Sequence, residues 1–87
     1  MILIRHKQFL KDWGKVKLTD GQFSKFINYV DCLQHGEVLP PEARNHCLHG
    51  NYKDYREFHL GGDMLLIYLI ENDNLILARL GTHSQLF

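Results

Sequence analysis

The apolar positions at the start of the chain change from an extended pattern to a helical one within about ten residues. Met1 to Arg5 form a short stretch rich in aliphatic side chains, which predicts a strand. Phe9, Leu10, Trp13 and Val16 then recur at helical spacing, which predicts a helix directly after the strand. We expect Trp13 to be a core residue held between this helix and a sheet.

A second helix is predicted from Thr19 onward. Gln22 follows Thr19 by three residues, which is the spacing of a capping box, and Gly36 after His35 is a suitable stop. Between them, one apolar stripe runs along about four helical turns, a pattern that predicts core rather than a cofactor site. Its members are Phe23, Phe26, Ile27, Val30 and Leu33.

Residues 36–50 are predicted to form a long connection, because Pro40 and Pro41 cannot continue a helix. Strand patterns follow, with Gly61-Gly62 permitting a tight reversal and a polar turn at 71–74. The predicted strands cover residues 52–59, 64–70 and 75–80.

The element order is therefore βααβββ, an α+β class. Consecutive strands joined by short turns pair antiparallel, so we expect an antiparallel sheet. Both predicted helices precede the three strands and can cover only one broad face, which leaves the other face partly open. Residues 1–87 are expected to form a single two-layer domain.

Composition excludes several classes of protein. The 45% hydrophobic and 23% charged residues are typical of a globular domain rather than a disordered one. No apolar run approaches the roughly 20 residues that span a bilayer, and the start of the chain lacks the pattern of a secretory signal, so we expect no membrane and a cytoplasmic location. Cys32 and Cys47 show no paired spacing and are expected to be free thiols.

The net charge of zero hides an asymmetry. Residues 1–17 contain five Lys or Arg and one Asp, a local excess of +4, and the rest of the chain carries the opposite excess. Such a segment can contact phosphates, although spaced cations are more often the solvated side of a helix.

Histidines supply the candidate chemistry. His46, His59 and His83, together with Asp63, come from four separate segments. In an antiparallel meander His59 and Asp63 flank one hairpin turn, and the lengths of the strands decide whether His83 joins them. If the last strand reaches His83, alternation also puts Arg79 on the same face. Imidazoles, a carboxylate and a guanidinium on an open sheet face suit transesterification of RNA, because one group can deprotonate a 2′-hydroxyl while another protonates the 5′-oxygen.

Four motifs occur in order in the carboxy-terminal half. They are H-x-L-x-G at 46–50, Y-R-[DE]-x-H at 55–59, the following Asp63, and G-[ST]-H-x-x-L-F at 81–87. Together they resemble the YafQ family of bacterial toxins, within the RelE-like superfamily, and length and element order extend the resemblance over nearly the whole chain. Met64 and Tyr52 depart from the family, since many relatives have Trp at these positions.

The resemblance implies a RelE-like fold and the toxin of a type II toxin–antitoxin system. Such a toxin is a ribosome-dependent endoribonuclease that cuts mRNA in the A site of the 70S ribosome, needs no metal or other cofactor, and is held inactive by a cognate antitoxin in a hetero-oligomer.

The resemblance also assigns roles to residues of this chain. It implies His83 as the general acid, His46 or His59 as the base, and Asp63 as an orienting group or itself the proton acceptor. Phe87 is expected to position a base, and Arg79 to balance charge on the phosphorane. Arg56 is a candidate RNA contact that packing or a salt bridge explains equally well.

Other readings compete with catalysis. A noncatalytic RNA-binding module, or a degenerate toxin that only titrates an antitoxin, would need no convergent histidines. A metal hydrolase is a third class, since His46 and His49 have H-x-x-H spacing, but no HExxH helix or cysteine pair accompanies them. A Cys47 nucleophile is disfavoured because neighbouring residues on an extended backbone point apart.

Overall fold

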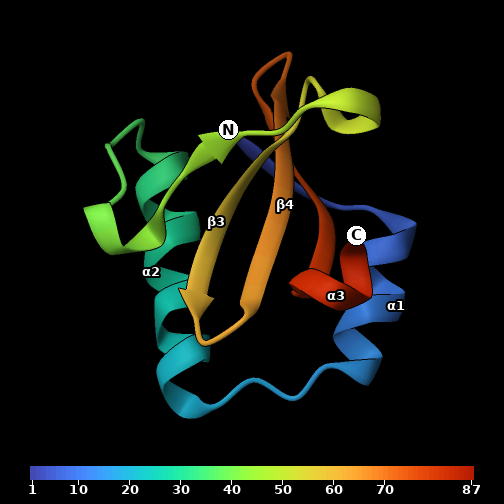
Figure 1. Ribbon diagram of the computed structural model, residues 1–87. Helices are drawn as coiled ribbons and strands as arrows, with labels where there is room; N and C mark the ends of the chain where they lie inside the picture. Colours follow the sequence, from blue (N-terminus) through green and yellow to red (C-terminus); the bar gives the residue numbers. More distant parts are fainter.

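The computed structural model describes residues 1–87, except for the side chain of Asn51. A five-stranded sheet forms one layer, and two helices cover one of its faces (Figure 1). In chain order the elements are β1 (Ile2–Arg5), α1 (Lys7–Lys15), α2 (Asp20–Gln34), the 3-10 turn η1 (Pro41–Ala43), β2 (His46–Cys47), the 3-10 turn η2 (Gly50–Tyr52), β3 (Arg56–Gly61), β4 (Met64–Glu71), β5 (Asn74–Thr82) and α3 (His83–Leu86).

The predicted α+β, two-layer architecture is confirmed, with one correction to the sheet. The strand order is β1-β5-β4-β3-β2, and the meander from β2 to β5 is antiparallel as expected. The first strand instead pairs parallel with β5, so the sheet is mixed. Because nearly the whole chain lies between β1 and β5, it supplies the long crossover that a parallel pair requires.

The sheet has two different faces because side chains alternate along its strands. Phe58, Leu66 and Leu80 point to the side of α1 and α2 and belong to the main core. Leu65 and Ile67 point to the opposite side, where Leu86 of α3 packs with them and Leu48, Tyr52 and Tyr55 partly cover them. One sheet face therefore remains partly open, as the element order predicts.

Local signals in the sequence place the ends of α2 correctly. Thr19 Oγ1 accepts a hydrogen bond from the Gln22 amide at 3.1 Å, and Gln22 Oε1 accepts one from the Thr19 amide at 3.0 Å, which completes the capping box. Gly36 follows the helix with a φ of 68°, a left-handed conformation that glycine adopts at little cost. The Gln22 side chain also donates to Gly61 O, which ties this helix start to the β3–β4 turn.

The expectation of a fully buried helical stripe is wrong at several positions. Trp13 is 42% exposed, and Phe23 and Ile27 on α2 are 45% and 49% exposed. The Trp13 ring on α1 and the Phe23 ring on α2 lie against each other, with centroids 6.3 Å apart, instead of entering the core. The result is an apolar groove of about 240 Å³, lined by Leu3, Arg5, Phe9, Leu10, Trp13, Phe26 and Leu77.

Asp12 on α1 fastens this helix to the part of β5 that extends beyond β1. Its carboxylate accepts from Arg79 Nε at 2.8 Å, from Arg79 Nη2 at 3.3 Å and from the Leu80 amide at 3.0 Å. Burial works against ionisation of Asp12, but these hydrogen bonds and the Arg79 charge outweigh it and hold the pKa of the carboxyl below its ordinary value.

Asp12→Asn is expected to lower the free energy of unfolding at pH 7 by about 1–3 kcal/mol, because it weakens charge-assisted bonds that are largely shielded from water. The folded-state pKa is the lower one, so this stabilisation is present above the unfolded aspartate pKa of about 3.9 and disappears as pH falls through the folded-state value. Urea unfolding of both proteins at pH 7 and at pH 2.5 checks the prediction. A difference that persists undiminished at the lower pH would contradict it.

Candidate active site on the open sheet face

Strand β3, between β4 and β2, directs Glu57 and His59 to the open face, because they are two residues apart on a strand. On the neighbouring strand His46 pairs with Glu57, so its side chain points to the same side. Three titratable side chains from two segments thereby meet on one surface.

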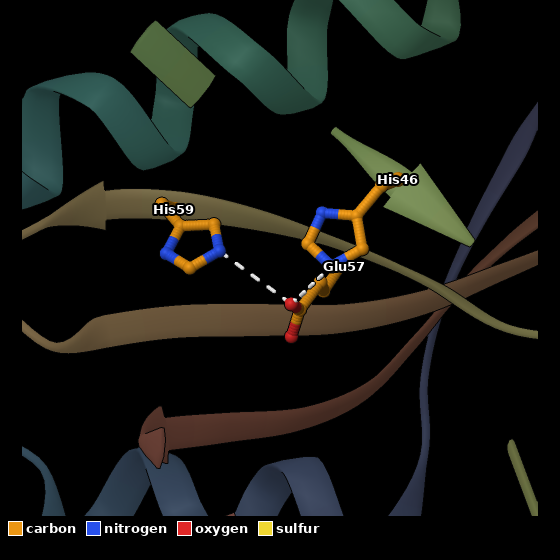
Figure 2. Close-up of side chains that lie close together, drawn as sticks. All are labelled: His46, Glu57 and His59. Atoms are coloured by element: carbon orange, nitrogen blue, oxygen red, sulfur yellow. Dashed lines mark ion pairs between the residues drawn. The ribbon is translucent and has the colours of Figure 1, made fainter. Parts of the chain in front are cut away.

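Figure 2 shows the His46 and His59 rings on either side of the Glu57 carboxylate. His46 Nε2 lies 2.7 Å from Glu57 Oε1, and His59 Nε2 lies 3.5 Å from the same oxygen. The two rings are roughly parallel, with centroids 6.0 Å apart. Glu57 is only 4% exposed, and its Oε2 atom has no hydrogen-bond partner among the described side chains and backbone.

Arg44 contacts both imidazole rings, His46 through its carbonyl and His59 through its side chain, and these contacts indicate which ring nitrogens carry hydrogen. Nδ1 of His46 lies 2.7 Å from the Arg44 carbonyl, which only accepts, so this nitrogen carries a hydrogen. Nε2 of the same ring is then the nitrogen that faces Glu57. Arg44 Nη2 lies 3.4 Å from His59 Nδ1, which favours the hydrogen on Nε2 of His59, directed toward Glu57.

Arg44 holds this position in a left-handed backbone conformation, with φ at 48°. For a residue that is not glycine, such a conformation costs roughly 1–3 kcal/mol. Here it turns the chain so that the Arg44 carbonyl meets the His46 ring.

A second group forms on the same face at the end of the chain. The condition that the last strand reaches His83 is not met, because β5 ends at Thr82 and His83 is the first residue of α3. Thr82 and Gln85 form a capping box that fixes this helix start. The His83 ring packs on Phe87 with centroids 4.9 Å apart, and Phe87 contacts Tyr52.

The two groups lie on opposite sides of β4. His59 pairs with Leu65 and Leu65 pairs with Gly81, so about 10 Å separates the β3 and β5 positions of this row. Asp63 lies in the intervening β3–β4 turn, where its carbonyl accepts from the His83 amide at 3.2 Å. Its exposed side chain makes no hydrogen bond or ion pair with a histidine among the described side chains.

The two arginines predicted for the site, Arg56 and Arg79, have different partners in the structure. Arg56 alternates with Glu57 on β3 and points to the other face, where it donates to Asn45 and Cys47. This position favours packing over RNA contact. Arg79 is paired with Asp12, and the hydrogen bond between them raises the pKa of Arg79 above its ordinary value, so the guanidinium stays charged.

Sequence reasoning missed Glu57, although it lies inside a quoted motif. The available signal was its spacing of two residues from His59, which puts both side chains on the same face of a strand. Its burial was not visible in the sequence, because charged residues are seldom buried without a partner. His46, Glu57 and His59 are also the residues able to hold a metal, with one donor atom from each within 4.8 Å of the others, whereas His49 lies outside this group.

A mixed sheet with two helices on one face, and histidines beside a buried carboxylate on the other, defines a small RelE-like toxin domain. Comparison with known proteins narrows this class. The chain belongs to the YafQ family, since the family model described as "Bacterial toxin of type II toxin-antitoxin system, YafQ" matches residues 2–87.

Individual relatives agree over almost their full length. The protein named "mRNA interferase toxin YafQ" from Escherichia coli K12 is 41% identical over 82 residues, which are 92% of this chain and 88% of that protein. A copper-bound mutant toxin from Helicobacter pylori has a TM-score of 0.89 at 38% identity, covering 99% of this chain and 98% of that one. The E. coli DinJ–YafQ complex has a TM-score of 0.82 at 29% identity, covering 98% and 96%.

The described helices include none with both the length and the apolar character needed to cross a membrane.

Gly81→Ala is expected to move α3 and with it His83. A Cβ at this position would lie 3.0 Å from Gln85 Oε1 and 3.3 Å from Leu86 Cδ2, and Gln85 cannot yield without weakening its capping bond to Thr82. We expect the His83 ring signals to shift in NMR spectra and the free energy of unfolding to fall by about 1–3 kcal/mol.

Gly14→Ala is the matched control, because a Cβ there meets open space on α1. It should leave the His83 signals unchanged and stabilise the helix by roughly 0.5–1 kcal/mol. Unchanged His83 signals in Gly81→Ala would show that the close packing of α3 on β5 does not position this ring.

Proposed function

We propose that this chain is an endoribonuclease toxin that cuts mRNA in the A site of the ribosome by acid–base transesterification without a metal. The observation that carries the proposal is the pair of groups on the open face, with His46, Glu57 and His59 on one side of β4 and His83 with Phe87 on the other.

The proposed reaction needs proton transfer at two oxygens. His46 or His59 takes the proton of the 2′-hydroxyl, O2′ then bonds to phosphorus, and the bond from phosphorus to O5′ breaks as His83 protonates that oxygen. The products are a 2′,3′-cyclic phosphate and a 5′-hydroxyl. Glu57 is placed to stabilise the imidazolium that forms when its neighbouring ring accepts the proton.

The separation of the two groups suits this chemistry. Entering and leaving oxygens lie roughly in line on opposite sides of phosphorus, so the base and the acid must approach from opposite sides. The spacing of about 10 Å across β4 leaves room for a phosphodiester between His59 and the start of α3.

Neighbouring side chains take supporting roles in this proposal. Phe87 is 54% exposed and packed against His83, so a nucleobase can stack on it while the scissile phosphate meets that histidine. Arg79 is held by Asp12 as a permanent cation near α3 and helps to balance charge on the phosphorane. Asp63 lies in the turn between the two groups, and its exposed carboxylate is kept as the alternative proton acceptor.

His83→Ala is expected to lower the rate of mRNA cleavage by about 10²–10⁴-fold, the usual contribution of one proton-transfer group. Cleavage is measured in a reconstituted translation reaction, with circular dichroism as the check on folding. His35→Ala is the control, since that exposed histidine at the end of α2 bonds only to Asp31. Full cleavage by a folded His83→Ala protein would eliminate this residue as the acid.

The same reaction separates the competing functions. Mapping of mRNA 5′ ends should give cuts at a fixed position within codons only when ribosomes translate the message, and cleavage should be undiminished in chelator. A wild-type protein that arrests nothing and cuts nothing would instead be a noncatalytic binding module. A substrate in the ribosomal A site places the activity in the cytoplasm.

The proposed partner that restrains the toxin is an antitoxin, as in the DinJ–YafQ complex. The apolar groove between α1 and α2 is its docking surface, and an amphipathic helix is the occupant that fits it. Arg5 lines the groove within a segment that carries an excess of +4, so the helix should present carboxylates along its edge nearest α1.

Leu10→Glu is expected to weaken antitoxin affinity at least about tenfold, because it puts a charge among the groove side chains. Val38→Glu is the matched control, since Val38 is 92% exposed and lies outside the groove. Titration calorimetry measures the affinity, and cleavage by both variants should equal that of the wild type. Equal affinity of the two variants would place the antitoxin elsewhere.

A further inference from the structure

We propose that one side of α1 binds the sugar–phosphate backbone of ribosomal RNA through a row of three lysines. Lys7, Lys11 and Lys15 form this row, the lysine stripe. The inference rests on the proposed function and deepens it, because it names the surface by which the toxin holds the ribosome while the open sheet face cuts the message.

The lysine stripe follows from the period of the helix. Its members are four residues apart, so each is rotated by about 40° and displaced by about 6 Å along the axis relative to the one before it. All three side chains are exposed, and Phe9, the buried residue of α1, lies on the opposite side of the helix. The cations therefore form a nearly straight row about 12 Å long that faces solvent.

Carboxylates near α1 do not neutralise the lysine stripe. Asp12, the acidic residue of this helix, is paired with Arg79. Asp20 lies toward the other flank of the helix, where it lines a hollow with Trp13 and Phe23. Within the part of the chain that the structure describes, the three lysines form no ion pair. Their charge is therefore available to a partner.

Helix stability does not account for this arrangement. Lys7 is four residues from Lys11, and Lys11 is four from Lys15, and like charges at that spacing destabilise a helix. Lys7 is also the first residue of α1, where the helix dipole favours acidic side chains, and the first turn contains none. A solvated face that stabilised the helix would instead place opposite charges four residues apart. The row costs stability, which points to a function in binding.

A polyanion is the partner that the lysine stripe fits. The whole chain has no net charge, yet residues 1–17 carry an excess of +4, so attraction to RNA must come from this segment. Lysine is a compact charge on a flexible stem, and contacts to phosphates fix the orientation of a protein without reading base sequence. A row of this kind suits an RNA of fixed shape that the toxin meets at every codon.

The place of the stripe favours ribosomal RNA over the message. Lys15 lines a hollow of about 240 Å³ between α1 and α3, together with Arg79 and Gln85. Figure 1 shows these two helices side by side. Helix α1 packs beside β5, whereas His59 lies beyond β4 on the open face. An RNA strand along α1 therefore holds the toxin beside the start of α3 without occupying the place of the scissile phosphate.

The binding test uses the full-length toxin and vacant 70S ribosomes that carry no message. A variant with Lys7→Gln, Lys11→Gln and Lys15→Gln should bind about 10- to 100-fold more weakly, because it loses three phosphate contacts. The slope of log affinity against log salt concentration should fall in magnitude by about 2–3. Cosedimentation with ribosomes over a range of salt measures both quantities, and circular dichroism confirms that the variant is folded.

The matched control lowers the net charge by the same amount at another place. It combines Ser24→Glu, Asn28→Glu and Val38→Glu, all at exposed positions on or after α2. We expect this control to bind ribosomes like the wild type. An equal loss of affinity in the control would overturn the inference, since net charge rather than the row of lysines would then govern binding.

A short single-stranded RNA identifies which RNA the stripe contacts. We expect the lysine variant and the wild type to bind it with equal affinity. A lysine variant that binds vacant ribosomes like the wild type but loses affinity for the short RNA would assign the stripe to the message and overturn the inference.

Lys11→Glu separates a binding role from a structural one. The glutamate would face Lys7 and Lys15 at the spacing that stabilises a helix. We expect the urea midpoint to be unchanged or higher, while ribosome affinity falls at least about tenfold. A lower midpoint accompanied by unchanged ribosome affinity would show that Lys11 serves the fold instead.

Cleavage measurements distinguish this inference from the proposed function. The lysine variant should cut with the wild-type kcat and a raised KM, because the stripe does not touch the reacting groups. A toxin that binds ribosomes through the stripe but cuts no message would refute the proposed function and leave the surface. Wild-type KM and wild-type ribosome affinity in the folded lysine variant would refute the surface and leave the proposed function.

Discussion

The candidate site depends on the contact between a buried carboxylate and two imidazoles. Glu57 lies on β3, between β2 and β4, and is almost fully removed from water, yet it belongs to the face that the two large helices leave uncovered. A buried negative charge is costly unless positive or hydrogen-donating groups surround it. His46 and His59 supply those groups, so the interaction that makes Glu57 tolerable also gathers the reactive side chains.

The rest of the fold can be understood as support for that contact. Alternation along β3 separates Phe58, which packs under α2, from its neighbours Glu57 and His59. The strained Arg44 backbone turns the chain so that two-residue β2 can deliver His46 to the same row. At the other side of β4, close packing of α3 on Gly81 fixes His83. Rigid strands thus set a distance between two chemical groups that flexible loops could not maintain.

The two faces of the sheet carry different surface features. The open face carries the histidines, and the helix-covered face carries the groove with its half-exposed Leu10 and Trp13. A partner in the groove would contact α1, and Asp12 on that helix holds Arg79 and β5, from which α3 begins.

The sequence by itself determined the features that depend on neighbours along the chain. The capping box at Thr19, the stop at Gly36, the hairpin at Gly61-Gly62 and the motif histidines were all visible as local patterns. Tertiary structure decided the parallel pairing of β1, the exposure of Trp13 and the burial of Glu57, because each depends on which distant segments pack together. It also decided that His83 begins a helix, since α3 spans a single turn and is too short to give a periodic signal. Periodicity shows which face a side chain occupies, but only the pairing of strands shows what it meets there.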